Sequence, residues 1–113
     1  MTHRRESRHK LWRLHTKTAV EAGIPVLFVE GRVSHAESAE LEAAVAQHPP
    51  DEAGNVLIDL SGVDYVSSAA LKVFQALGER QAEKGARLRL RAPSVAAKLA
   101  LELSGLVELV DSA

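Results

Sequence analysis

The sequence predicts a single α/β domain, in which a mixed β-sheet of four to five strands carries about three to four helices. Three observations support this fold class. The chain has 113 residues, a length typical of one domain. Its residues are 46% apolar and 26% charged, which allows one hydrophobic core. Strand-like and helix-like periodicities alternate from Thr18 onward, as they do in mixed layer structures.

A basic N-terminal segment precedes an acidic body. Residues 1–17 carry six Lys or Arg against one Glu, and the remaining residues carry eight basic against fourteen acidic side chains. The two parts therefore have net charges of +5 and −6. We expect residues 1–17 to form a flexible arm and residues 18–113 to form the folded domain, because the arm has little apolar surface to bury.

The first part of the body predicts a hairpin and a helix. Residues 14–20 and 24–29 are predicted to form two strands around a glycine turn, because they are rich in β-branched and aromatic residues. Residues 34–48 have helical spacing, with Ser34 as the expected cap and two prolines as the stop.

The central part predicts a strand followed by a helix. Residues 56–60 are apolar and predict a short strand, which runs into a loop over residues 61–66. The helix is expected to begin at Ser67 or Ser68, because a hydroxyl side chain caps the free amides of a first turn. It can run to Lys84, where a glycine follows.

The last part predicts a strand, a helix and a further short strand. Residues 86–91 alternate leucine and arginine, which is typical of a strand with one buried face. Ser94 is the expected N-cap of the helix, which ends at Gly105, and the residue after this glycine is expected to fold back on the helix. Residues 107–110 predict the final strand. The apolar stripe of the helix contains Val95, Leu99 and Leu103.

Three arginines project from one side of the fourth predicted strand, because side chains alternate between the two faces of a sheet. We expect them to pair with nearby carboxylates or to cover the sheet with their aliphatic stems. Nucleic-acid binding is not expected, since the body is net negative and offers no aromatic platform for stacking bases. The three residues are Arg87, Arg89 and Arg91.

No enzyme template fits the chain. It has no cysteine, which excludes disulfides, thiol catalysis and cysteine-ligated metal sites. It also lacks a phosphate-binding glycine loop, a dinucleotide fingerprint, a serine-hydrolase elbow and two metal-binding histidines on one helix. The helix dipole explains His48, at the predicted helix end, better than catalysis does. We therefore expect a non-enzymatic protein without metal or cofactor.

The sequence predicts a cytoplasmic protein. No apolar run approaches the roughly 20 residues that span a bilayer. The first ten residues lack the apolar core of a secretory signal. Membrane insertion is therefore not expected, and the absence of cysteine is compatible with a reducing compartment.

A distinctive motif links the third predicted strand to the helix after it. Residues 59–71 are Asp-Leu-Ser-Gly-Val-Asp-Tyr-Val-Ser-Ser-Ala-Ala-Leu. This segment resembles the signature of the STAS domain of anti-sigma-factor antagonists, which is Asp-Leu-Ser, a short turn, an aromatic and an apolar residue, and then Asp-Ser-Ser-Gly-Leu. Residues 28–33 resemble the family's second strand and its glycine turn. Pro93 with residues 103–106 resembles the final helix and stop, so the resemblance covers residues 18–112.

The resemblance implies a regulatory role for the motif. In the family, a kinase that is also an anti-sigma factor phosphorylates the serine after the motif's Asp, and this role falls on Ser68, with Ser67 as the alternative. The chain departs from the pattern at Ser67, which stands where the family has Asp, and at Ala70, which stands where it has Gly. The residues that the resemblance places at the partner surface are Asp64, Tyr65, Ser67, Ser68, Ala70, Leu71 and Ser34.

Two functions follow from the resemblance as expectations. The first is an anti-sigma-factor antagonist that binds an anti-sigma-factor serine/threonine kinase when dephosphorylated, is released by phosphorylation and is reset by a serine phosphatase. The second is a constitutive accessory or scaffold subunit, beside the ATPase of a lipid-transporting complex or in a stress-sensing complex. The departures at residues 67 and 70 favour considering the second. In either case we expect a monomer or a weak dimer.

Overall fold

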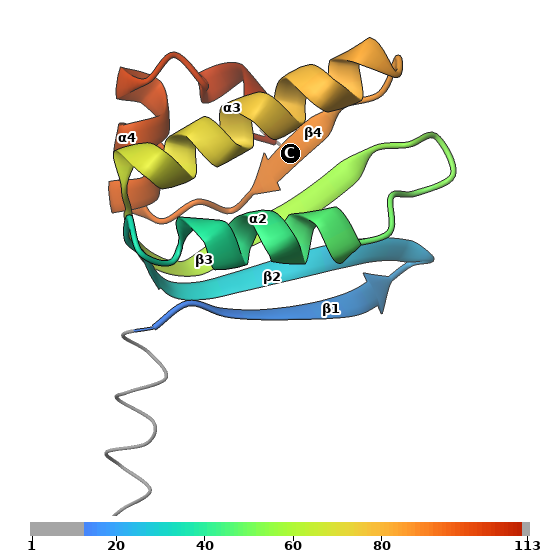
Figure 1. Cartoon of the computed structure of the whole chain (residues 1–113). Coiled ribbons are helices and arrows are strands. Elements are labelled where there is room, and N and C mark those ends of the chain that lie inside the picture. The colour runs from blue at the N-terminus through green and yellow to red at the C-terminus, as the bar shows by residue number, and fades with distance from the viewer. Residues whose placement is uncertain (1–12, 112–113) are drawn as a thin grey trace, which may run out of the picture.

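The computed structural model describes residues 13–111 and has a four-stranded β-sheet with helices packed on it (Figure 1). The predicted mixed α/β architecture is confirmed. Residues 1–12, most of the predicted arm, lie outside the described residues, as do residues 112–113. The strands, in their order in the sheet, are β1 (His15–Glu21), β2 (Ile24–Val33), β3 (Val56–Val66) and β4 (Leu88–Arg91). The helices are α2 (Ser38–Gln47), α3 (Ser68–Glu83), α4 (Val95–Leu103) and the short 3-10 helix η1 (Val107–Leu109).

The direction of the strands places three connections at one edge of the sheet. β1 pairs antiparallel with β2, whereas β2, β3 and β4 are parallel to one another. Parallel neighbours need a crossover connection, and α2 and α3 provide it. The segments that lead from β2, β3 and β4 into the next helix therefore leave from the same edge (Figure 1). We name it the carboxyl edge.

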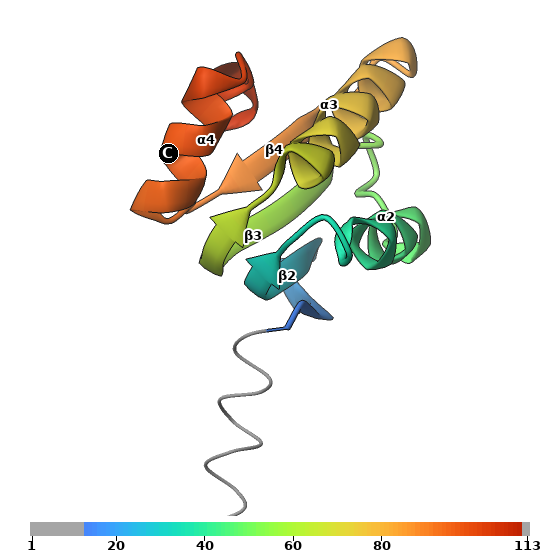
Figure 2. The ribbon, with the colours of Figure 1, turned by 60° about the vertical axis from the view of Figure 1, so that its left-hand side comes forward.

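The helices cover one face of the sheet and its β4 side. α2 and α3 lie on the same face, and α4 lies at the β4 side, away from β1 (Figures 1 and 2). One hydrophobic cluster forms between these helices and the sheet, and Phe74 of α3 has no exposed surface in it. No helix among residues 13–111 has the length and apolar character needed to cross a membrane. Other large, fully buried side chains of the cluster are Leu41, Ile58, Leu60, Leu90, Leu101, Val29, Val33 and Val63.

The second face of the sheet carries charged side chains around an aromatic ring. In the strand pairing, Phe28 of β2 lies beside Asp59 of β3, which lies beside Arg91 of β4. The Arg91 guanidinium donates to Asp59 and to Glu21 of β1, both at 2.8 Å. It also lies 5.7 Å from the centre of the Phe28 ring, so Arg91 contacts all three other strands. Arg89 also forms an ion pair, which confirms the predicted carboxylate pairing for two of the three arginines.

Two strands are longer than predicted. β2 continues to Val33 and β3 to Val66, so residues 61–66 belong to a strand and not to the predicted loop. The pairing between the two strands shifts register twice, and Gly31 adopts a φ of 92° beside the second shift. The glycine turn that the resemblance implies within residues 28–33 is therefore an irregularity inside β2. Such β-bulges let pairing resume after an extra residue, which local sequence does not reveal.

Helix α2 and the last predicted strand also differ from the prediction. α2 begins at Ser38, after Glu37, because the residues from Ser34 form a separate turn. The segment after α4 forms η1 and not a strand, although Val110 makes one parallel bridge to Leu90 of β4. The expected start and stop of α3 and of α4 are confirmed.

The predicted apolar stripe of α4 does not face the core. Ala97 and Leu101 are fully buried, whereas Val95, Leu99 and Leu103 are 88%, 55% and 80% exposed. The helix has apolar residues on two sides, and the side with the smaller alanine is the buried one. Helical spacing alone could not distinguish them, because both sides satisfy it.

Candidate partner-binding site

Three serines follow the strands that end at the carboxyl edge. Ser34 follows β2, Ser67 follows β3, and Ser94 stands between β4 and α4. The N–H of Ser67 donates to the carbonyl oxygen of Val33 at 2.9 Å, which ties the start of α3 to the end of β2. The edge therefore brings together residues from segments that are far apart in the chain (Figure 1).

The start of α3 has one buried and one exposed serine. Ser67 is 7% exposed, and its hydroxyl accepts a hydrogen bond from the N–H of Ala70 at 3.2 Å. This N-cap satisfies one of the free amides of the first turn. Ser68, the first helical residue, is exposed. Its hydroxyl therefore lies in solvent at the positive end of the helix dipole.

The charges at this helix start favour an added anion. The first turn of α3 contains no acidic residue. Lys72 is exposed and lies four residues after Ser68, so the two side chains share one face of the helix. An anionic group on Ser68 would therefore meet the helix dipole and a lysine, with no like charge in its own turn.

Asp64 and Tyr65 lie at the end of β3, just before this helix start. Asp64 is exposed, and Tyr65 is 43% exposed. The guanidinium of Arg32, on β2, lies 5.0 Å from the centre of the Tyr65 ring, which is a cation–π contact between paired strands. The motif did not indicate Arg32, because its position beside Tyr65 follows from the pairing of two distant segments.

Ser34 and Ser94 take part in local hydrogen bonds. The hydroxyl of Ser34 donates to the Glu37 carboxylate, which also accepts from the Ser34 N–H at 3.3 Å. The hydroxyl of Ser94 accepts from the N–H of Ala97 at 3.2 Å and donates to the carbonyl oxygen of Val63 at 2.6 Å. Ser94 therefore caps α4 and also joins it to β3. Both serines shape the edge and do not present unengaged hydroxyls.

Other expected surface residues lie inside the fold. Ala70 has no exposed surface and belongs to the core cluster, and Leu71 is partly buried and packs against this cluster. The methyl group at residue 70 therefore contacts the core and not the solvent. Among the residues expected at the partner surface, the exposed ones are Asp64, Tyr65 and Ser68.

Asp59, the first residue of the motif, has structural contacts of its own. Its carboxylate accepts from the N–H and the hydroxyl of Ser61, at 2.9 and 2.6 Å, and from Arg91. Burial raises the pKa of Asp59, but the bonds from Ser61 and Arg91 outweigh it, so the pKa lies below its ordinary value. Asp59 is therefore ionised at neutral pH and holds the second face of the sheet together.

The described residues contain no cluster of potential metal ligands, and the buried histidine has few partners. Within residues 13–111, no three His, Asp or Glu are placed to hold a metal ion. His48 is 6% exposed, its Nδ1 lies 3.4 Å from Thr18 Oγ1, and its Nε2 has no hydrogen-bond partner there. Burial lowers the pKa of His48, which keeps the ring neutral at pH 7. Its side-chain contact is a threonine, not a serine or a carboxylate.

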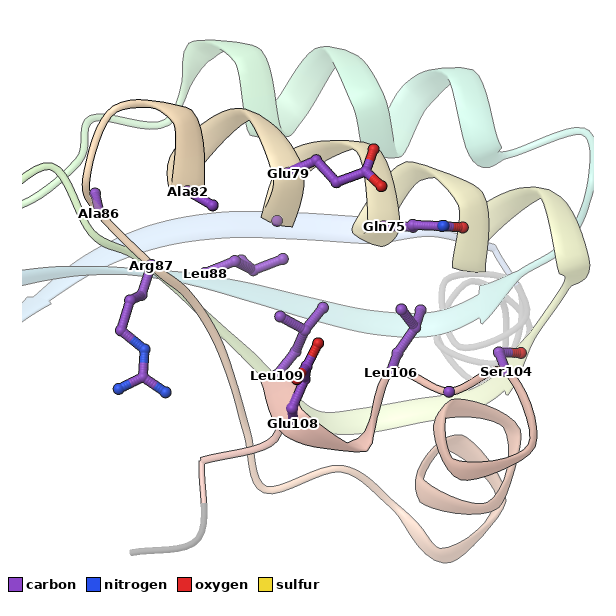
Figure 3. A pocket seen from close by; sticks show the side chains of 12 residues that line it. Gln75, Glu79, Ala82, Ala86, Arg87, Leu88, Ser104, Leu106, Glu108 and Leu109 are labelled. Atoms are coloured by element: carbon purple, nitrogen blue, oxygen red, sulfur yellow. The ribbon is translucent and has the colours of Figure 1, made fainter.

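A cavity of about 440 Å³ lies between the second half of α3 and the C-terminal segment (Figure 3). The sequence did not indicate it, because its walls come from α3, β4 and the residues around η1. Ser68 is not among the lining residues, so the cavity is separate from the start of α3. Its apolar lining includes Leu88, Leu106 and Leu109, and its charged lining is Glu79, Arg87 and Glu108.

Three solved structures with a similar fold are described as anti-sigma-factor antagonists. One from Mycobacterium paratuberculosis is 25% identical with a TM-score of 0.71, over 89% of this chain and 87% of that one. An anti-sigma-factor antagonist (STAS) domain protein from Planctomyces limnophilus is 20% identical with a TM-score of 0.66, over 87% and 91%. The unphosphorylated antagonist SpoIIAA is 15% identical with a TM-score of 0.65, over 89% and 88%.

A family model covers nearly all of the described residues. No curated protein matches the chain significantly. The model described as "Mlab, STAS domain" matches residues 18–111. This range contains the motif, the carboxyl edge and α2, α3 and α4. The chain therefore belongs to the STAS domain family.

Proposed function

We propose that this chain is an anti-sigma-factor antagonist, which binds an anti-sigma-factor serine/threonine kinase through the carboxyl edge while Ser68 is unphosphorylated. The observation that carries the proposal is the exposed hydroxyl of Ser68 beside the buried cap of Ser67. The antagonist that shares 25% identity and the fold supports this role. The protein then acts in the cytoplasm as a regulator and not as an enzyme.

The contrast between the two serines supports Ser68 as the phosphorylated residue. A kinase must bring a phosphoryl group in line with the hydroxyl oxygen, and the Ser67 hydroxyl is buried and engaged as a cap. Modification of Ser67 would break this cap, at a cost of about 1 kcal/mol. The Ser68 hydroxyl makes no hydrogen bond within residues 13–111, so the fold loses nothing when it is modified.

Phosphate at Ser68 is expected to change the interface and not the fold. It adds a charge of about −1.5 to −2, which the start of α3 stabilises. A partner surface packed on the neutral hydroxyl would bury this anion without a matching charge. Such burial costs several kcal/mol, or a loss of affinity of about hundredfold or more. Phosphorylation then releases the kinase, and a serine phosphatase restores binding.

A second candidate function is that of a constitutive accessory subunit. The description of the matching family model names Mlab and does not name an anti-sigma-factor antagonist. Ser67 also replaces the acidic residue of the antagonist motif, so the kinase meets no carboxylate next to Ser68. Both observations favour a protein that holds its partner at the same edge without a phosphorylation cycle.

Substitutions at Ser68 distinguish the two functions. The chain is incubated with ATP and the anti-sigma-factor kinase encoded nearest to its gene, and phosphopeptides are mapped by mass spectrometry. We expect phosphate on Ser68, retained binding by Ser68→Ala and at least a tenfold loss of affinity for Ser68→Asp. Ser104→Asp is the matched control, because Ser104 is exposed at the far end of α4.

Each other outcome of this experiment has a definite meaning. Phosphate on Ser67 alone contradicts the assignment of the modified residue. If no phosphate appears and both Ser68 variants hold a partner as tightly as the unmodified chain, the accessory-subunit function is supported instead.

A further inference from the structure

Helix α4 has two apolar sides, and only one of them is covered. Ala97 and Leu101 pack in the core, whereas Val95, Leu99 and Leu103 are largely exposed. The exposed residues are four apart, so they align along one face of the helix. We name Val95, Leu99 and Leu103 the α4 stripe. Figure 2 shows α4 at the side of the molecule, with no other described element over its outer side.

The two flanks of the α4 stripe differ in character. A turn of 100° per residue places Lys98 and Glu102 along one flank and Ala96 and Ala100 along the other. The charged flank carries one positive and one negative side chain, and both are exposed. The alanine flank has small side chains, which permit another helix to approach closely.

These flanks make the stripe complementary to itself. In an antiparallel pair of α4 helices related by a two-fold axis at Leu99, the charged flanks of the two copies lie on the same side. Each Lys98 then lies about 3 Å, measured along the helix axis, from the level of the partner's Glu102. The partner's Lys98 lies at the same axial offset, but Glu102 is turned closer to the partner helix, at about 60° from Leu99 against about 100° for Lys98. Each Lys98 therefore lies nearer to the partner's Glu102 than to the partner's Lys98, and the apolar residues meet between the helices.

We propose that a second copy of this chain covers the α4 stripe, in a symmetric antiparallel pair centred on Leu99. In this register the two copies of Leu99 meet at the axis, and each Val95 meets the partner's Leu103. Stable interfaces bury about 800 Å² on each partner. A helix of nine residues supplies only part of this area, so the dimer is weak and depends on protein concentration.

Engineered disulfides test the register, because the chain has no cysteine of its own. Leu99→Cys is expected to cross-link to itself under mild oxidation. Val95→Cys alone is not, because its two copies lie about 12 Å apart along the axis, beyond the roughly 7 Å between Cα atoms that a disulfide spans. A mixture of Val95→Cys and Leu103→Cys is expected to cross-link as a heterodimer.

Val20→Cys measures random collision, since Val20 is 68% exposed on β1, the strand at the opposite side of the sheet from β4. Cross-linking of Leu99→Cys no faster than that of Val20→Cys overturns the proposal. Preferential self-linking of Val95→Cys indicates parallel helices and overturns the antiparallel register.

Sedimentation equilibrium over a wide range of protein concentration tests the pair without cross-links. Leu99→Glu is expected to abolish the dimer, whereas Val20→Glu keeps it. Lys98→Glu and Glu102→Lys are each expected to weaken it several-fold, and the two together are expected to restore it. A chain that stays monomeric at all concentrations, or a dimer that Leu99→Glu leaves unchanged, contradicts the proposal.

Discussion

Helices α3 and α4 begin and end in the same way but turn different sides to the solvent. Each begins at a serine whose hydroxyl accepts from the N–H three residues later, and each stops before a glycine with positive φ. Exposed positions of α3 include Lys72 and Glu79, whereas α4 exposes the α4 stripe. Local signals therefore determine where a helix begins and ends. The residues on its outer side depend instead on whether that side contacts solvent or another protein surface.

The largest expected effect separates the two sides of α4. Leu101→Ala removes a fully buried side chain and is expected to lower the free energy of unfolding by about 2–5 kcal/mol. Leu103→Ala changes a side chain that is 80% exposed and is expected to cost about 0.5 kcal/mol or less. Urea denaturation at low protein concentration measures both. Equal losses would mean that the α4 stripe is part of the core.

The two serine caps are expected to differ in strength. Ser67→Ala removes one hydrogen bond and is expected to cost about 1 kcal/mol. Ser94→Ala also leaves the carbonyl oxygen of Val63 without its donor, so we expect a larger cost, about 2 kcal/mol. Ser104→Ala, at an exposed serine, is the control in the same denaturation measurement. A larger loss for Ser67→Ala would show that the bond to Val63 contributes little.

The two glycine stops, in contrast, are expected to be equivalent. Gly85 and Gly105 have φ values of 76° and 75°, and a Cβ added at either would meet no atom within 4 Å. The cost of alanine at either position therefore comes only from the left-handed backbone conformation and is expected to be about 1 kcal/mol. Asparagine, which tolerates this conformation, is expected to recover part of the loss. Thermal unfolding of the four variants measures these costs. A much larger loss of stability at one glycine than at the other would refute the equivalence.

Helix α2 has neither a serine cap nor a glycine stop, and the residue at its end is expected to make the stability of the protein depend on pH. It has no side-chain cap and ends at His48, whose pKa is lowered by burial. The unfolded chain therefore binds a proton below about pH 6.5 more readily than the folded chain does, so stability is full above this pH. It is expected to fall as the pH decreases toward the lowered pKa of the folded state.

The free energy of unfolding, followed between pH 7.5 and 5.5, measures this smallest effect. His48→Gln is expected to give a shallower decline than the unmodified chain, and His35→Gln, at an exposed histidine, is the control. An unchanged decline in His48→Gln would assign the pH response to other groups.

What the sequence could predict depends on the distance over which each feature is determined. The starts of α3 and α4 were predictable, because Ser67 and Ser94 bond to amides three residues away. The extension of β3 to Val66 was not, because it depends on pairing with β2 across two bulges. The buried side of α4 was also missed, since both sides are apolar and only the tertiary packing selects one.

The candidate site shows the same division. The motif pointed to Ser68, and the local cap explains why this residue is exposed while its neighbour is buried. The contact of Arg32 with Tyr65 could not be predicted, because it joins two strands that are paired only in the folded chain. The cavity beside α3 has the same origin.

The contacts of Arg91 have a consequence for the unfolding rate of the protein. Its partners Asp59 and Glu21 lie 32 and 70 residues away in the chain, and Phe28 lies on a third strand. Such contacts require all four strands to be in place, so we expect them to form after the main folding barrier has been crossed. Interactions absent from the transition state act by slowing the unfolding rate. We therefore expect Arg91 to slow unfolding more than it speeds folding, and so to lengthen the lifetime of the folded molecule.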